Sequence, residues 1–171
     1  KSIKPFPKLK PRPCVFEYIY FARPDSLINK KCAYEYRKNL GKELARETDL
    51  KADLVVPVPD SGVPAALGFA EKSIKKFELG LIRNHYVGRT FIEPTQNIRS
   101  LGVKLKLSTT QTIVKNKSII LIDDSIVRGT TCHKIVKMLY ESGAKEVHVR
   151  IACPEIKYPD FYGVDMPTKE E

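Results

Sequence analysis

Two adjacent carboxylates, Asp123 and Asp124, follow directly on a short apolar run at residues 119–122. The run is rich in isoleucine and has the length of a buried parallel strand. Parallel sheets bind ligands beyond the carboxyl ends of their strands, which is where the two acids lie. Carboxylates accept hydrogen bonds from hydroxyl groups, so the pair is suited to a sugar diol. An isolated Asp-Asp pair more often ends a strand and caps a helix, so the loop that follows decides between these interpretations.

That loop has the composition of a phosphate-binding turn. Its residues are Ser125, Ile126, Val127, Arg128, Gly129, Thr130 and Thr131. Hydroxyl groups, backbone N–H groups and the positive end of a following helix dipole can converge there on one phosphate, and the glycine lets the backbone approach closely. The helix is predicted over residues 131–142, with Ile135, Met138 and Leu139 on one face and Gly143 as its stop. A diol site beside a phosphate site predicts binding of a phosphoribose group.

The rest of the chain alternates predicted strands and helices. The apolar runs predict strands at residues 15–21, 54–58, 79–82 and 147–151, and helices at 33–47 and 64–72. On the first helix, Tyr36, Leu40 and Leu44 recur every four residues, as one face of a helix requires. Such alternation indicates an α/β fold with a parallel sheet and helices on both faces. No Gly-x-Gly-x-x-Gly follows a strand, which argues against a dinucleotide-binding fold.

Residues 83–108 have weak periodicity and an excess of positive charge. They carry five bases against one acid; these are Arg83, Arg89, Arg99, Lys104, Lys106 and Glu93. Loops of this length inside a compact domain usually have a function. The segment is therefore predicted to be a flexible basic lid that closes over an anionic substrate.

Length and composition indicate one globular domain. The chain has 171 residues, of which 42% are hydrophobic. Residues 1–13 carry four prolines among lysines and predict a linker or arm, which leaves 14–171 as the domain. The chain shows neither an apolar stretch of transmembrane length nor a signal peptide, so we expect a cytoplasmic protein without a membrane partner. The net charge of +10 suits nucleic acid and an anionic substrate equally, but no DNA-binding element is recognisable and no nucleic-acid partner is expected.

Four segments, in the same order, resemble a known family. Residues 118–131 resemble the 5-phosphoribosyl-1-pyrophosphate (PRPP) signature of type I phosphoribosyltransferases. The segments FEYIYFARPDS at 16–26, VPVPDSG at 56–62 and YVGRTFIEPTQ at 86–96 resemble glutamine PRPP amidotransferases. The resemblance implies the type I phosphoribosyltransferase fold. It also implies the family's reaction, in which PRPP and glutamine-derived ammonia give 5-phosphoribosylamine and pyrophosphate at the first committed step of purine synthesis.

The resemblance also implies residue roles. Asp123 and Asp124 would hold the ribose hydroxyls, directly or through Mg²⁺, and residues 125–131 would hold the 5′-phosphate. Asp60 and Ser61 would hold the pyrophosphate, with Ser61 nearest to the metal, although residues 60–62 alone read as an ordinary turn. In the lid, Arg83 and Arg89 would contact pyrophosphate and Tyr86 would shield the reacting carbon. Catalysis would depend on positioning and electrostatics, because ammonia is already a nucleophile.

The chain departs from the family in two ways. The family takes ammonia from a glutaminase domain with an N-terminal cysteine nucleophile, and it continues beyond the position of Glu171. We therefore expect the phosphoribosyltransferase part of a longer enzyme, with PRPP and the ammonia of a glutaminase domain as partners, in a homo-oligomer. Some members carry an iron–sulfur cluster, and Cys14 stands at the place of one ligand. Asp160 stands where another would be, and a carboxylate in place of a thiolate argues against a cluster.

Two other functions remain open at this point. A phosphoribosyltransferase acting on a nucleobase shares the PRPP signature, but it would need a hood over the base, and no such extra segment is recognisable. A PRPP-sensing regulator could keep the pocket without catalysis, but the basic lid argues against it.

Overall fold

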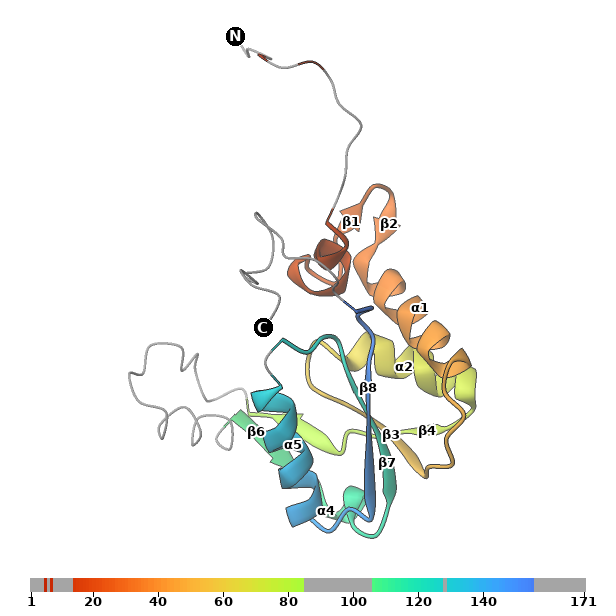
Figure 1. The fold of residues 1–171 in the computed structure, drawn as a ribbon, viewed down its shortest axis with the longest axis vertical. Helices are drawn as coiled ribbons and strands as arrows, with labels where there is room; N and C mark the ends of the chain where they lie inside the picture. Colours follow the sequence, from red (N-terminus) through yellow and green to blue (C-terminus); the bar gives the residue numbers. More distant parts are fainter. Residues whose placement is uncertain (1–4, 6, 8–13, 85–105, 128, 156–171) are drawn as a thin grey trace, which may run out of the picture.

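The computed structural model describes residues 5, 7, 14–84, 106–127 and 129–155. Strands and helices alternate along the chain, with a four-stranded sheet between layers of helices (Figure 1). The elements are η1 (Glu17–Phe21), β1 (Leu27–Ile28), β2 (Lys31–Cys32), α1 (Ala33–Arg46), β3 (Leu54–Pro57), α2 (Val63–Ser73), β4 (Lys76–Phe77), β5 (Leu81–Arg83), β6 (Leu107–Thr109), α4 (Gln111–Val114), β7 (Ser118–Asp123), α5 (Thr130–Glu141) and β8 (Glu146–Ile151).

The central sheet is parallel throughout. Its strand order is β4-β3-β7-β8, and each neighbouring pair runs in the same direction. Val55 of β3 lies opposite Ile120 of β7, which in turn lies opposite His148 of β8. In Figure 1, α1 and α2 lie on one side of the sheet and α5 on the other. The predicted α/β fold with helices on both faces is confirmed.

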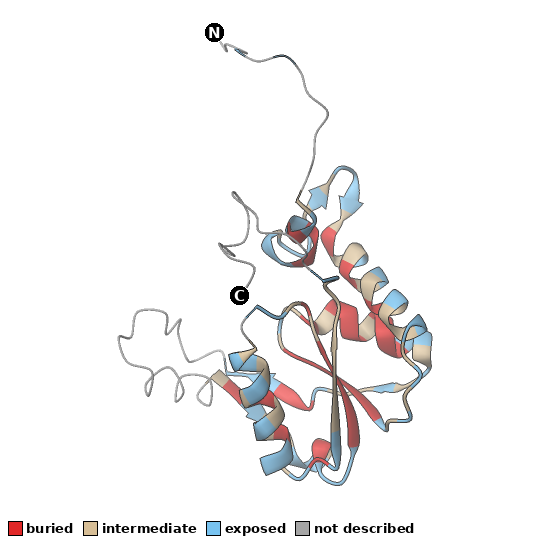
Figure 2. Cartoon of the chain, viewed as in Figure 1, coloured by how far each residue is buried: buried red, intermediate tan, exposed pale blue. Residues whose placement is uncertain are grey.

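The side chains of β7 alternate between two hydrophobic clusters. Ile119 and Leu121 pack with Ile135 and Leu139 of α5. Ile120 and Ile122 pack with α2, in the cluster that contains Phe69. All four strand residues have no exposed surface, and Figure 2 shows the central strands as the buried layer of the molecule. The alternation follows from the two-residue period of a strand, and it places Asp123 and Asp124 toward opposite faces where the strand ends.

Helices α1 and α2 approach each other unusually closely. A Cβ atom on Gly41 would lie 1.8 Å from the carbonyl oxygen of Ala65, and one on Gly68 would lie 1.9 Å from that of Lys38. The buried residues of α1 are Ala33, Arg37 and Gly41. The helix predicted at residues 33–47 is confirmed, and Tyr36, Leu40 and Leu44 on it are partly buried. Close packing of two backbones needs small residues, which a search for large apolar side chains does not find.

The predicted strand at residues 15–21 is a helix. Within η1 the N–H of Ala22 donates to the carbonyl of Glu17 at 3.0 Å, which is the five-residue step of a π-helix. Arg37 stabilises the end of this helix, because its guanidinium donates to the carbonyl oxygens of Tyr18 at 2.8 Å and Ala22 at 2.7 Å. The aromatic and β-branched residues favour a strand locally, but tertiary packing and this buried cation favour the helix.

Two short ribbons lie outside the main sheet. Strands β1 and β2 form a hairpin whose turn residues, Asn29 and Lys30, both have positive φ. Strands β5 and β6 pair antiparallel, from Leu81 opposite Thr109 to Arg83 opposite Leu107. The strand predicted at residues 79–82 thus belongs to a separate ribbon at the base of the predicted lid. Within the described ranges, no helix has the length and apolarity needed to cross a membrane.

Candidate functional site

Two loops meet at the carboxyl end of the sheet because β3 and β7 are neighbours. The N–H of Val58, just after β3, donates to the carbonyl of Ile122 at 2.8 Å. Gly62 closes the turn by donating its N–H to the carbonyl of Val58 at 3.0 Å. A Cβ on Gly62 would lie 2.5 Å from the carbonyl oxygen of Ile122, so only glycine fits there. The turn that carries Asp60 and Ser61 therefore begins at the edge of the sheet where β7 ends, with Asp123 and Asp124.

The loop after β7 leads into the N-terminus of α5. Gly129 precedes the helix with φ of 70°, and its carbonyl accepts the N–H of His133 at 2.9 Å. Apart from Gly129 and its two chain neighbours, no heavy atom of the described residues lies within 4 Å of the place a Gly129 Cβ would take. Thr130 and Thr131 are exposed in the first turn. Open space, hydroxyl groups and a helix N-terminus occur together here, which suits an anion.

Asp123 is the last residue of β7 and is half-buried. Burial raises the pKa of its carboxyl from 3.8 to about 7, and the charge of Asp124 adds to the rise. The N–H of Asp124 donates to Asp123 Oδ1 at 2.9 Å, which acts in the opposite direction. A cation or hydroxyl donors bound at this carboxyl group would stabilise its charged form and so lower the raised pKa.

Asp124 is buried, with 6% of its surface exposed. The hydroxyl of Ser125 donates to its Oδ1, and the N–H of Cys153 donates to its backbone carbonyl at 2.8 Å. Its Oδ2 is buried without a hydrogen-bond partner among the described residues. An unsatisfied buried carboxylate oxygen is costly, and it marks a place where a donor or a metal ion would be held.

Arg83 lies at the edge of the same site. Its Nη1 is 2.6 Å from Asp60 Oδ2, and both side chains are exposed. This ion pair connects the end of β5 to the loop after β3. Of the other predicted residues, Arg89, Tyr86 and Arg128 lie outside the described residues, as does most of the predicted lid.

Arg37 is the residue that the sequence interpretation missed. It is 6% exposed, and burial lowers the pKa of its guanidinium while the negative charge of Asp124 raises it. Two cysteines also lie near the acids. Burial raises the thiol pKa of Cys132, with a further rise from Asp123, and that of Cys153, with a further rise from Asp124. In the sequence, the burial of Arg37 could have been indicated only by its position between the small residues Ala33 and Gly41 on one face of the helix.

The metal-binding potential of the site is limited. No group of three or more His, Cys, Asp or Glu side chains in the described ranges could hold an ion. The carboxylates of Asp123 and Asp124 nevertheless offer the hard oxygen atoms that Mg²⁺ prefers, one of them without a partner. These residues fit a magnesium ion that takes its remaining ligands from a substrate. Asp160 lies outside the described residues, so the predicted absence of a cluster at Cys14 stays a prediction.

The comparisons with known proteins agree with this geometry. A family model described as "Phosphoribosyl transferase domain" matches residues 28–159. The chain is 57% identical over 171 residues to an amidophosphoribosyltransferase of Rhizobium etli, covering all of this chain and 34% of that protein. An amidophosphoribosyltransferase of Methanocaldococcus jannaschii is 56% identical over 158 residues, which are 92% of this chain and 34% of that protein. The chain thus spans about a third of the length of these relatives.

A solved structure shows the same arrangement. Glutamine PRPP amidotransferase from B. subtilis, complexed with ADP and GMP, superposes with a TM-score of 0.80 at 54% identity. The superposition covers 92% of this chain and 35% of that protein. The resemblance stated from the four sequence segments is confirmed, and the chain belongs to the phosphoribosyl transferase domain family.

Proposed function

We propose that this chain is the phosphoribosyltransferase part of an amidophosphoribosyltransferase. It transfers the phosphoribosyl group of PRPP to ammonia, releases pyrophosphate and forms 5-phosphoribosylamine, the first committed step of purine synthesis. A glutaminase domain supplies the ammonia from glutamine. The identity of more than half of the residues to named amidophosphoribosyltransferases supports this reaction over transfer to a nucleobase.

One observation carries the proposal. The loop after β3 begins at the edge of the sheet where β7 ends with the acid pair, and the N–H of Val58 donates there to the carbonyl of Ile122. PRPP has a 5′-phosphate, a ribose diol and a pyrophosphate, and each needs a different kind of partner. The structure offers a helix N-terminus, two carboxylates and a glycine turn with an arginine beside it, which correspond to these three parts.

We assign the roles accordingly. Asp123 and Asp124 accept hydrogen bonds from the ribose hydroxyls, and residues 125–131 hold the 5′-phosphate. Asp60 and Ser61, with the guanidinium of Arg83, hold the pyrophosphate. In the free chain Arg83 is paired with Asp60. Since both partners are exposed, the pair is weak enough for pyrophosphate to replace the carboxylate.

Magnesium belongs to the proposed site. Ser61, Asp123 and Asp124 would hold it together with oxygen atoms of PRPP. When bound, the cation offsets the negative charge that accumulates on departing pyrophosphate. The unpartnered Oδ2 of Asp124 and the raised pKa of Asp123 support a cation at this place. Arg89 and Tyr86, from the lid, would complete the enclosure of the reacting carbon and exclude water.

The experiment that tests the function measures release of pyrophosphate from PRPP. The purified chain is supplied with Mg²⁺ and ammonium chloride, and parallel reactions contain adenine, hypoxanthine or orotate in place of ammonium. Turnover that depends on ammonia supports the proposal. Turnover only with a base would establish a nucleobase enzyme, and tight PRPP binding without any turnover would favour a sensor.

The cellular setting is part of the proposal. Purine synthesis from PRPP places the protein in the cytoplasm, although relatives from Glycine max and Arabidopsis thaliana are named chloroplastic. A homo-oligomer, with the glutaminase domain in the same assembly, remains the predicted state, and light scattering of the full-length protein would measure it.

A further inference from the structure

Ser125 is the first residue of the proposed phosphate loop, yet its hydroxyl is directed to a carboxylate. It donates a hydrogen bond to Oδ1 of Asp124, which follows directly on β7. A serine hydroxyl has a single proton to donate, and a phosphate that carries full charge can only accept. The hydrogen bond to Asp124 therefore uses the proton that a phosphate oxygen would need.

The other oxygen of the Asp124 carboxylate is left without a donor. Oδ2 is buried and has no hydrogen-bond partner among the described residues. The backbone of Asp124 is held on both sides, because its N–H donates to Asp123 Oδ1 at 2.9 Å and its carbonyl accepts the N–H of Cys153 at 2.8 Å. The carboxylate itself can turn about its last torsion, which has broad minima. The hydrogen bond from Ser125 therefore determines which of the two oxygens stays open.

The remainder of the loop offers the donors that a phosphate needs. Gly129 precedes α5 and has no side chain that could cap it, so the first N–H groups of the helix remain for a ligand. Thr130 and Thr131 are exposed in the first turn, whereas Ser125 is partly buried. The loop thus has two kinds of hydroxyl group, one that is directed to the acid and two at the N-terminus of the helix.

We infer that Ser125 is a positioning residue for Asp124, which holds Oδ1 so that Oδ2 remains for a hydroxyl group of the ribose, while the threonines and backbone of α5 hold the phosphate. The inference deepens the proposed function and rests on it, because it needs a phosphoribose at this loop. It divides residues 125–131 into a part that serves the diol and a part that serves the phosphate. Without the serine hydroxyl, both oxygens of Asp124 would lack a donor, and the carboxylate could turn away from the diol.

The test uses two ligands that differ in their hydroxyl groups. Ribose 5-phosphate carries the diol, and tetrahydrofurfuryl phosphate has the same kind of ring and phosphate without hydroxyl groups. Dissociation constants are measured by calorimetry, without added Mg²⁺, for the wild-type chain, Ser125→Ala, Ser125→Thr and two controls. The first control, Thr130→Val, removes a hydroxyl from the phosphate end and keeps the branched shape of the side chain.

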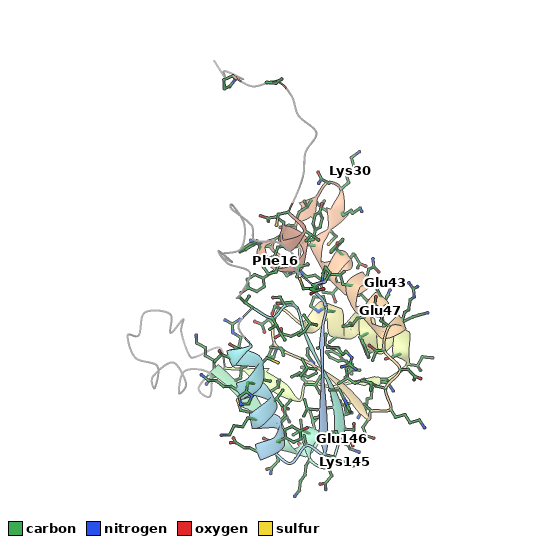
Figure 3. The ribbon with its side chains drawn as sticks, in the orientation of Figure 1. Phe16, Lys30, Glu43, Glu47, Lys145 and Glu146 are labelled. Carbon is green, nitrogen blue, oxygen red and sulfur yellow. The ribbon has the colours of Figure 1, made fainter. Side chains whose placement is uncertain are left out.

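The second control, Ser118→Ala, is matched for the loss of a hydrogen bond between a serine and a carboxylate. Ser118 is the first residue of β7, and its hydroxyl donates to Oε2 of Glu146 at 2.9 Å. Figure 3 labels Glu146 at the start of β8, which is the opposite end of the parallel sheet from the acid pair. The two alanine substitutions remove the same kind of hydrogen bond, but only Ser125→Ala removes it at the proposed site.

Ser125→Ala should raise the dissociation constant for ribose 5-phosphate roughly tenfold, a change of about 1.4 kcal/mol, and leave that for tetrahydrofurfuryl phosphate within about twofold. Ser125→Thr keeps the hydroxyl and should bind both ligands like the wild type, as should Ser118→Ala. Thr130→Val should weaken both ligands by a similar factor. Equal weakening of both ligands by Ser125→Ala would make the serine a phosphate ligand and overturn the inference, and so would an unchanged affinity for ribose 5-phosphate.

A double variant tests whether the serine acts through the acid. Asp124→Ala removes the acceptor, so the addition of Ser125→Ala should change the affinity for ribose 5-phosphate by less than about twofold, and the full loss in that background would overturn the inference. If Ser125→Ala does not fold, Ser125→Cys, whose thiol is a weak donor, decides by the same two ligands. A wild-type chain that binds neither ligand would overturn the proposed function itself, which is a different outcome from normal wild-type binding with an unaffected variant.

Discussion

Asp123→Asn should stabilise the ligand-free chain at about pH 8 and weaken its proposed substrate site. The pKa of this carboxyl is raised from 3.8 to about 7, by burial first and by the charge of Asp124 second. Above neutral pH the folded chain therefore holds a half-buried anion next to a second carboxylate. Asparagine keeps the oxygen that accepts the N–H of Asp124, but it carries no charge.

The sign and size of the expected change in stability follow from proton linkage. The unfolded chain loses the proton of Asp123 near 3.8 and the folded chain near 7, so the folded state binds more protons in this interval and stability falls as the pH rises through it. A rise of about three pKa units, at about 1.4 kcal/mol each, gives an upper limit of about 4 kcal/mol. Because the folded chain relaxes around a charge, we expect a gain of about 2–3 kcal/mol for asparagine, or roughly 5–10 °C in melting temperature.

Chemical and thermal unfolding at about pH 8 and pH 4.5, with magnesium chelated, measure this difference. The advantage of asparagine should be largest at the higher pH and should fall to about 1 kcal/mol or less at the lower one, where Asp123 is protonated in the folded chain. Added Mg²⁺ and PRPP should stabilise the wild type much more than the variant, because the charged carboxylate holds them. A variant less stable than the wild type at about pH 8, or a difference that does not change with pH, would refute the reasoning.

Three other substitutions test the remaining parts of the structure. Asp124→Asn removes the neighbouring charge that raises the pKa of Asp123, so in urea unfolding the stability should fall less between about pH 4.5 and pH 8 than in the wild type; an unchanged pH dependence would contradict the coupling of the two acids. Gly41→Ala would place Cβ 1.8 Å from the carbonyl oxygen of Ala65. We expect urea unfolding to show a loss of at least about 2 kcal/mol in stability. An unchanged unfolding midpoint would mean that α1 and α2 can move apart with little loss of stability. In Gly129→Ala the new methyl group enters open space, but the residue has to adopt a φ of 70°. We expect a loss of only about 1 kcal/mol in stability and weaker binding of ribose 5-phosphate by calorimetry. Unchanged affinity would argue against phosphate binding at this loop.

The elements that could be predicted from the sequence are those whose signal is local. The apolar run before Asp123 predicted β7, and the spacing of Ile135 and Leu139 predicted α5 almost to its ends. Gly143 follows that helix with φ of 91°, as its role as a stop requires. The position of the turn at residues 60–62 at the same edge of the sheet as the acid pair could be predicted too, because parallel strands end at one edge of a sheet.

The features that could not be predicted depend on contacts between distant residues. The pattern at residues 15–21 is that of a strand. The helix η1 forms instead because Arg37 donates hydrogen bonds to its backbone carbonyl oxygens and the surrounding packing favours it. The buried residues of α1 include Ala33 and Gly41, because α1 lies close to α2, and the sequence pattern of large apolar residues does not indicate these small ones. The burial of Arg37 and Asp124 has no local signal, since neither charge indicates in the sequence that it will be buried.

The β5–β6 ribbon has a consequence for protein engineering. Leu81 and Leu107 fix its two strands in the core beside α5, and the hydroxyls of Thr109 and Ser142 bond the ribbon to the end of that helix. The chain between Arg83 and Leu107 therefore starts and finishes at one fixed point, whatever its length. Closing a loop twice as long costs only about 0.6 kcal/mol more. Libraries that vary the length and sequence of this segment could thus explore new acceptors for the phosphoribosyl group without redesign of the parallel sheet.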